Sequence, residues 1–211
     1  MNWKALGALI LAAAGGVAQQ DADRQALERR IAAVKDAIAR NDAKLRRYSW
    51  TESTQVTVKG KAKSIEQNEC RYGSDGQLLR TPIGARPPSD PKLRDDLDRI
   101  RSLIRRYVPP DPNAMREAFQ AGKAAINTAS GVLTFNDYAK PGDMLTLAFD
   151  PGSRNIHSYE VTTYLDEPSD RVTLNAQFST LSDGTNFLEE YDLDARRKEI
   201  HVKTANFGHS K

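Results

Sequence analysis

An intramolecular disulfide bond is one feature that this chain cannot have, because Cys70 is its only cysteine among 211 residues. Stability must therefore come from the packing of side chains. Cys70 lies in a strand-like stretch, Gln67–Tyr72, where a buried cysteine commonly behaves as a small hydrophobic residue. Nothing in the flanking sequence argues for a lowered pKa of the thiol, so we interpret Cys70 as inert rather than as a nucleophile or redox partner.

An excess of charge of one sign is also missing. The chain carries 31 Lys and Arg residues against 28 Asp and Glu residues, a formal net charge of +3 at pH 7. Basic residues cluster only locally, as at Arg46–Arg47 and Arg196–Lys198, and acidic residues lie near each cluster. Because a nucleic-acid-binding surface needs a stripe of positive charge, the sequence argues against nucleic acid as a partner.

Long hydrophobic runs are absent except near the start, where Ala5 to Val17 follows a short segment that contains Lys4. This run is too short for a permanent transmembrane helix, and small residues suit signal-peptidase cleavage after Ala18. We therefore expect residues 1–18 to be a signal peptide and residues 19–211 to form a single domain. The alternative is a retained N-terminal anchor.

The predicted leader also sets the expected location of the protein. No cysteine stands at the end of the run to accept a lipid. We expect the mature chain to be secreted, most simply into the periplasm, without a lipid anchor and without an integral membrane segment after cleavage.

Recognisable catalytic and metal-binding patterns are lacking too. The three histidines, His157, His201 and His209, share no metal-ligand spacing, and His209 is expected in a frayed tail. There is no G-x-S-x-G elbow and no glycine-rich phosphate loop before a helix. Adjacent strand residues point to opposite faces, so one of Glu189 and Glu190 is a candidate buried acid. We expect no catalytic residues, metal or cofactor, and therefore a protein that is not an enzyme.

Three helices are predicted from hydrophobic periodicity. Residues 21–48 form the clearest amphipathic pattern, with apolar residues at three- and four-residue steps. A second pattern runs from Asp90–Pro91 to Tyr107, before a pair of prolines. A third, short helix follows, with Asp111 as N-cap, Pro112 at the first helical position and an end near Gly122.

The remaining segments are predicted to be strands. Alternation is clearest in residues 171–181, where Val172, Leu174, Ala176 and Phe178 share one face and polar residues share the other. Short turns between the strands indicate an antiparallel meander of about seven to eight strands. The predicted fold is α+β, a strongly curved antiparallel sheet that forms an incomplete barrel, with the helices packed on its concave face.

The inward-facing side chains of this sheet are the candidate ligand-binding residues. They are aliphatic or aromatic and comprise Trp50, Val58, Leu147, Phe149, Val161, Leu174, Phe178 and Tyr191. One interpretation is a cavity between sheet and helices that holds an apolar ligand. The other is an ordinary hydrophobic core, and hydrophobic periodicity does not distinguish the two.

The layout resembles a known family. The segments that carry the likeness are Tyr48–Glu52, Val58–Lys61, the hairpin Arg71–Gln77, and the turns Lys140–Asp143 and Asp150–Gly152. They are similar in topology and hairpin style to the lipoprotein-carrier fold of periplasmic and outer-membrane lipoprotein-sorting proteins, and to uncharacterised exported bacterial proteins. The resemblance implies a half-barrel around a helical lid that receives acyl chains.

The expected function follows from the leader, the one-sided sheet and this resemblance together. We expect a non-enzymatic binder or carrier of a hydrophobic ligand, either a lipid or a lipidated protein, in the cell envelope. The alternative is a structural or protein-interaction module of the envelope with a solid core and no ligand.

Overall fold

The computed structural model describes residues 29, 36, 39–84, 91, 93–108, 110–127, 130–150 and 156–211. The chain divides into two compact units, Met1–Ile38 and Ala39–Lys211. The predicted signal peptide and most of the predicted helix 21–48 lie outside the described residues. Within that helix, the described residues 29, 36 and 39–45 are helical. None of the described helices is both long enough and apolar enough to cross a bilayer.

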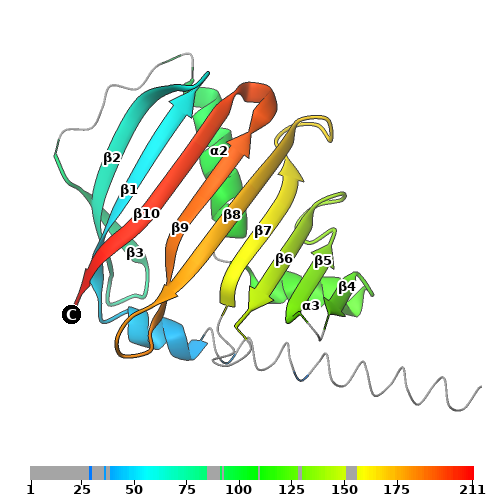
Figure 1. Ribbon diagram of the computed structural model, residues 1–211, viewed down its shortest axis with the longest axis horizontal. Helices are drawn as coiled ribbons and strands as arrows, with labels where there is room; N and C mark the ends of the chain where they lie inside the picture. Colours follow the sequence, from blue (N-terminus) through cyan, green and yellow to red (C-terminus); the bar gives the residue numbers. More distant parts are fainter. Residues whose placement is uncertain are drawn as a thin grey trace, which may run out of the picture. The chain divides into compact units, whose positions relative to one another are not determined.

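Residues Ala39–Lys211 are built on one antiparallel sheet of ten strands (Figure 1). The strands are β1 (Ser49–Val58), β2 (Lys61–Tyr72), β3 (Leu78–Pro82), β4 (Ala124–Asn127), β5 (Val132–Asn136), β6 (Met144–Phe149), β7 (Ile156–Tyr164), β8 (Arg171–Thr180), β9 (Asn186–Ala195) and β10 (Ile200–Ser210). Their spatial order is β3-β2-β1-β10-β9-β8-β7-β6-β5-β4. The chain therefore starts inside the sheet at β1, runs outward to the edge strand β3, crosses to the opposite edge at β4 and returns strand by strand, until β10 pairs with β1.

The α+β class and the antiparallel pairing agree with the sequence prediction, but the number of strands was wrong. The sheet has ten strands rather than about seven to eight. The short strand β4, which has only four residues, explains part of the difference. Such segments contain too few alternations to be distinguished from loops. The sheet is open, with β3 and β4 as its two edges.

One face of the sheet is buried and the other is polar, as the alternation predicts. In β8, Val172, Leu174 and Ala176 are buried, whereas Thr173 and Asn175 between them are partly exposed. The inward-facing residues of neighbouring strands are cross-strand partners, so the buried face extends across the sheet. Its central row consists of Val56, Val202, Leu193, Leu174, Val161, Leu145 and Phe135.

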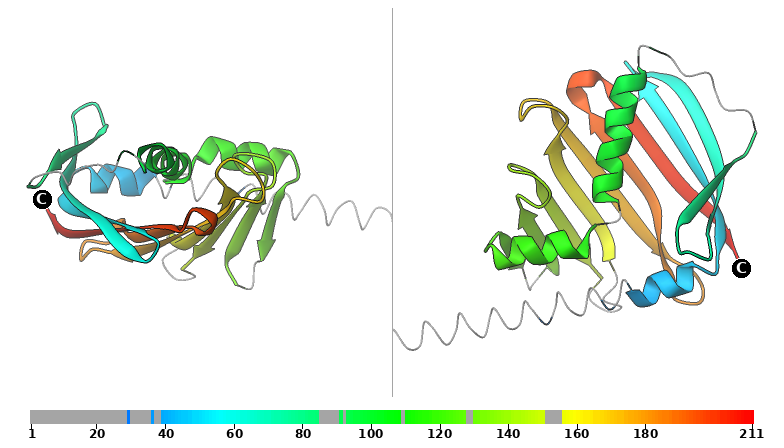
Figure 2. Two further views of the ribbon diagram at one scale, coloured as in Figure 1. Left: turned by 90° about the horizontal axis from the view of Figure 1, so that it is seen from above. Right: turned by 180° about the vertical axis from the view of Figure 1, so that it is seen from behind.

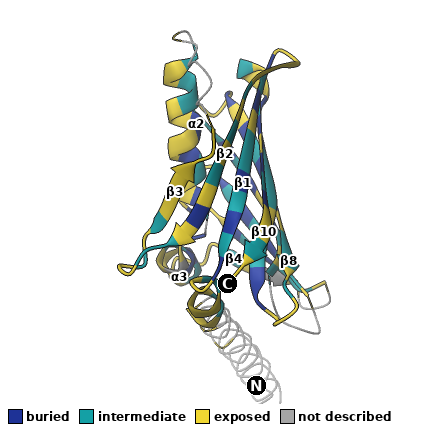
Figure 3. Cartoon of the chain, turned by 90° about the vertical axis from the view of Figure 1, so that its left-hand side faces the viewer, coloured by how far each residue is buried: buried dark blue, intermediate teal, exposed yellow. Residues whose placement is uncertain are grey.

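Two helices, α2 (Arg94–Tyr107) and α3 (Pro112–Gln120), lie against the buried face of the sheet (Figure 2). Helix α2 buries Ile100, Leu103 and Tyr107 and exposes the side that faces away from the sheet (Figure 3). The apolar side of the helix and the apolar row of the sheet thus form one core. We call this face of the sheet the helix-facing surface.

The ends of these helices follow local rules. Asp111 is the N-cap of α3, where its Oδ1 accepts a 2.8 Å hydrogen bond from the Asn113 backbone, as predicted. Helix α2 ends at Tyr107 because Val108, which precedes Pro109, is extended. It begins at Arg94, later than the predicted Asp90, which lies outside the described residues. Its N-cap, Leu93, has no side chain that can cap the helix.

The position of His209 corrects a second prediction. This residue lies within β10 rather than in a frayed tail. Between the pairs Thr51–Phe207 and Ser49–Ser210, β10 contains one residue more than β1, and Gly208 has a φ of 69°. The extra residue forms a β-bulge in β10. In this segment the His209 ring stacks on the Trp50 indole, at a centroid distance of 5.7 Å.

Candidate functional site

Strand alternation and pairing place all eight predicted ligand-binding residues on the helix-facing surface, but in different surroundings. Leu147, Val161 and Leu174 are completely buried and belong to the core beneath the helices. Trp50 and Val58 are buried near opposite ends of β1. The other three, Phe149, Phe178 and Tyr191, are half-buried. The eight residues therefore do not converge on one point.

Strand β1 shows how the character of this surface changes along the sheet. Its inward positions are, in order, Trp50, Glu52, Thr54, Val56 and Val58. The end at Val58 continues the apolar core, whereas Glu52 and Thr54 place polar groups on a surface that is otherwise hydrophobic. An isolated polar group is costly to bury, so each of these side chains needs a partner.

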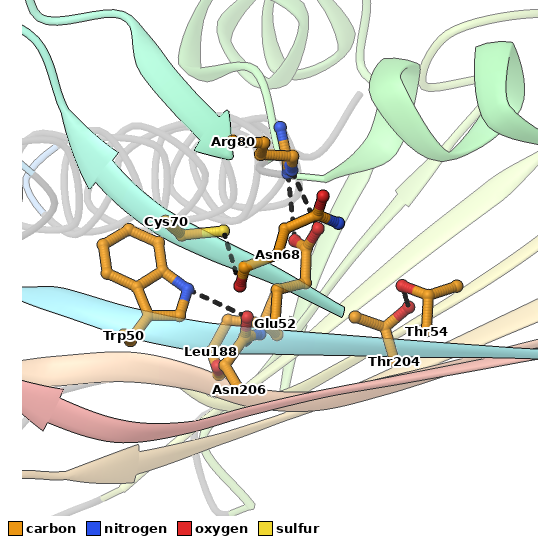
Figure 4. Close-up of polar contacts among 9 residues, drawn as sticks. All are labelled: Trp50, Glu52, Thr54, Asn68, Cys70, Arg80, Leu188, Thr204 and Asn206. Atoms are coloured by element: carbon orange, nitrogen blue, oxygen red, sulfur yellow. Dashed lines mark hydrogen bonds and ion pairs between the residues drawn. The ribbon is translucent and has the colours of Figure 1, made fainter. Parts of the chain in front are cut away.

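Glu52 has that partner in Arg80 of the edge strand β3 (Figure 4). Nε and Nη2 of Arg80 donate to Oε1 and Oε2 of Glu52 at 2.8 and 3.1 Å. Burial alone would lower the pKa of Arg80, but the hydrogen bonds and the charge of Glu52 outweigh it and the pKa is raised. Glu52 is only 8% exposed, while the Arg80 side chain is 48% exposed. The pair therefore joins the buried surface to the solvent.

Two further groups surround this ion pair. The Trp50 Nε1–H donates to Oδ1 of Asn206 at 3.0 Å, and Nδ2 of Asn206 donates to the Leu188 carbonyl at 3.0 Å. The Cys70 side chain is completely buried, and burial together with the negative charge of Glu52 raises its pKa to about 11. A thiol with that pKa is protonated at neutral pH, which favours the inert interpretation of Cys70.

A row of hydroxyl groups continues from the ion pair across the sheet. Oγ1 of Thr54 and Oγ1 of Thr204 are 2.9 Å apart, and the Tyr191 side chain is hydrogen-bonded to Thr204. Register places Tyr191 opposite Ala176, and Ala176 opposite Tyr159. We call this set of residues the polar band: Glu52, Thr54, Arg80, Tyr159, Tyr191 and Thr204.

Tyr159 is the unusual member of the polar band. It is 2% exposed, and its hydroxyl has no hydrogen-bond partner among the described residues. Burial raises the pKa of this phenol well above its ordinary value, followed by the influence of Tyr191 and Tyr138. Its ring lies 5.8 Å from that of Phe178. Because a buried tyrosine normally finds a partner for its hydroxyl, this group is an unused donor on the helix-facing surface.

The histidines do not form a site. His157 is exposed, His201 lies 3.8 Å from Asp192, and His209 contacts the rings of Trp50 and Phe187. Burial lowers the pKa of His209. Within the described ranges, no group of three or more His, Cys, Asp or Glu side chains is placed to hold a metal ion.

The candidate buried acid was assigned to the wrong residue. Glu189 is exposed, and Glu190 forms an ion pair with Lys203 at 2.9 Å, so neither is buried. The buried acids among the described residues are Glu52, Asp143 and Asp170, and Glu52 is the one on strand β1. A signal for it was present in the sequence, because Glu52 is in phase with Trp50 and Val56 on one face of a strand. Arg80 offered no such signal, since it is brought to Glu52 only by the β2–β3 hairpin.

Comparison with known proteins gives no further assignment. No protein-family model matches the chain, and neither a curated protein nor a solved structure matches it.

Proposed function

We propose that this protein is exported and binds or carries a hydrophobic ligand, a lipid or a lipidated protein, without chemical conversion. The ligand lies on the helix-facing surface, where the sheet curves around it as an incomplete barrel. The observation that carries the proposal is the change in that surface between its two ends. Under the helices Leu147, Val161 and Leu174 are fully buried and apolar, whereas from β9 toward β1 and β3 the surface combines half-buried aromatic rings with most of the polar band.

Aromatic residues spread across the helix-facing surface, from β2 to β7, support binding of an acyl chain. The rings of Trp50 and Tyr72 lie 5.8 Å apart, and those of Tyr159 and Phe178 are also 5.8 Å apart. Tyr72, Phe178 and Tyr191 are only half-buried, so part of each ring can still lose contact with water when a ligand binds. Ligand sites are typically apolar surfaces with a few placed polar groups, and this region has that composition.

The resemblance to the lipoprotein-carrier fold supports the same proposal. The resemblance implied a half-barrel around a helical lid, and an open antiparallel sheet with helices on one face is compatible with that arrangement. Lipoprotein sorting itself would require a lipidated protein as the ligand. A free lipid satisfies the same surface chemistry, so both belong to the proposal.

Tryptophan fluorescence provides a direct test, because the chain has only two tryptophans, Trp3 and Trp50. In the mature chain, which loses Trp3 with the leader, or in a Trp3→Phe variant of the full chain, lipids with brominated acyl chains should quench Trp50, and the matched lipid without bromine should not. Native mass spectrometry of protein purified from the periplasm should detect a bound lipid. A ligand-free mass, together with no quenching and no gain in melting temperature on adding acyl ligands, would contradict the proposal.

The second candidate function is an envelope interaction module with a solid core. The complete burial of Leu147, Val161 and Leu174 favours it, because these three residues already have protein partners on the helix side. This candidate predicts a protein partner in envelope cross-linking and no acyl-dependent quenching of Trp50.

A further inference from the structure

We propose that the polar band receives the uncharged, hydrogen-bonding headgroup of an amphiphile, such as the ester and hydroxyl groups of an acylglycerol. The acyl chain then follows the half-buried aromatic residues beside the band. This inference rests on the proposed function and narrows it to one class of ligand.

The charge balance of the polar band favours a neutral headgroup. Glu52 and Arg80 neutralise each other through two hydrogen bonds, and they are the only charged members of the band. An anionic headgroup would meet the buried Glu52 carboxylate, and a cationic headgroup would meet Arg80. Either charge would lose hydration without gaining an unpaired opposite charge, which is unfavourable at a partly buried site.

The hydrogen-bond donors of the polar band favour a ligand that carries oxygen acceptors. The hydroxyl of Tyr159 is buried without a partner in the part of the chain that the structure describes. Arg80 uses Nε and Nη2 for Glu52, and with respect to the described residues its Nη1 remains as a further donor. A carbonyl or ester oxygen accepts such hydrogen bonds without carrying a charge.

In the row of inward-facing side chains, the buried Tyr159 is two strands away from the half-buried Tyr191. In the register, only Ala176 stands between Tyr159 of β7 and Tyr191 of β9, and alanine contributes a single methyl group. The two phenols therefore flank the smallest side chain in this row. Thr204 and Thr54 extend the hydroxyl groups to the strand that carries Glu52.

A series of twelve-carbon ligands tests the headgroup preference. Monolauroylglycerol is neutral, laurate is an anion and dodecyltrimethylammonium is a cation, while the chain length is constant. Each is titrated, below the concentration at which it forms micelles, against a brominated lipid that quenches Trp50 in the Trp3→Phe protein. Monolauroylglycerol should bind about tenfold more tightly than either ion, the effect of one or two buried hydrogen bonds.

Three substitutions connect that preference to the polar band. Tyr159→Phe should weaken monolauroylglycerol binding by about tenfold through the loss of one donor. Tyr164→Phe, on the same strand, removes a hydroxyl bonded to Pro141 and serves as the matched control. Glu52→Gln leaves the charge of Arg80 uncompensated and should shift the preference toward laurate. Arg80→Gln should shift it toward the cation, and it tests the same point if Glu52→Gln does not fold.

The outcomes separate this inference from the proposed function. If none of the three ligands displaces the brominated lipid and that lipid itself does not quench Trp50, the proposed function fails. If all three bind equally, or laurate binds best to the unmodified protein, the function stands and the neutral-headgroup inference is overturned. The inference is also overturned if Tyr159→Phe leaves monolauroylglycerol affinity unchanged, because the hydroxyl then serves at most a buried water.

Discussion

The hydroxyl of Tyr107, the last residue of α2, donates a 2.6 Å hydrogen bond to Oδ2 of Asp143 at the start of β6. The same hydroxyl lies 2.9 Å from Oγ1 of Thr163 on β7, and all three residues are buried. Oδ2 of Asp143 also accepts hydrogen bonds from the backbone N–H groups of Ala139 and Lys140. This network fixes the end of α2 to two strands of the sheet.

Removing the Tyr107 hydroxyl should destabilise the protein more than breaking an exposed contact of the same helix. Tyr107→Phe leaves a buried carboxylate with one donor fewer, and we expect a loss of about 1–3 kcal/mol in the free energy of unfolding. Arg99→Ala is the control, because it removes an ion pair to Asp166 whose side chains are about half exposed and should cost about 1 kcal/mol or less. Urea unfolding measures both, and equal losses would contradict the role assigned to Tyr107.

Cys70 should react with iodoacetamide only when the protein unfolds. Its side chain is buried, and with a pKa of about 11 only about one thiol in a thousand is ionised at pH 8. A second cysteine introduced at the exposed Ser182 serves as control and should react immediately. Mass spectrometry of the labelled protein checks this, and rapid labelling of Cys70 in the folded protein would show that the thiol is accessible.

Protonation of His209 should lower the free energy of unfolding of the protein in mild acid. Burial lowers the pKa of His209 below its ordinary value of 6.5, so the unfolded chain binds a proton more readily than the folded one. The contribution of His209 is fully present above the unfolded pKa and is lost as the pH falls from about 6.5 toward the folded pKa.

A pair of histidine variants isolates this contribution. His209→Gln should reduce the loss of stability between pH 7.5 and pH 5, measured by urea unfolding at both values, since the titrating group is gone. The exposed His157, replaced by Gln, should leave the loss unchanged. An identical pH dependence in both variants would assign the effect to other groups.

Alanine substitutions at two glycines in hairpin turns compare the cost of backbone strain alone with the cost of strain plus a close side-chain contact. Gly60 and Gly76 have φ angles of 70° and 78°, so alanine should cost about 1 kcal/mol of stability at either position. A Cβ at Gly60 would meet nothing within 4 Å, whereas a Cβ at Gly76 would lie 2.8 Å from Nη1 of Arg46. The Arg46 guanidinium is the end of an exposed, flexible side chain and can move aside, so the two variants should lose similar stability in thermal unfolding, and adding Arg46→Ala to Gly76→Ala should change that loss little.

Local patterns predicted the strands and helix ends well, where neighbours in sequence are neighbours in space. The alternation of residues 171–180 and the Asp111 cap of α3 are examples. The strand total was wrong because β4, with four residues, is recognisable only through its pairing with β5. The interpretation of Glu189 and Glu190 was wrong because a register shift between Gln177 and Phe178 occurs in this part of the β8–β9 pair. Such an irregularity alters the strict alternation on which that interpretation depended.

By itself, the sequence determined which side chains point inward wherever a strand is regular, including the polar pair Glu52 and Thr54 between Trp50 and Val56. Strand geometry repeats every two residues, so that information is local. Only the tertiary structure decided that Arg80 neutralises Glu52, that the Tyr159 hydroxyl finds no partner among the described residues, and that Leu147 and Leu174 are core residues. Those properties depend on which strands pair and where the helices pack, and both are set by contacts between residues far apart in the chain.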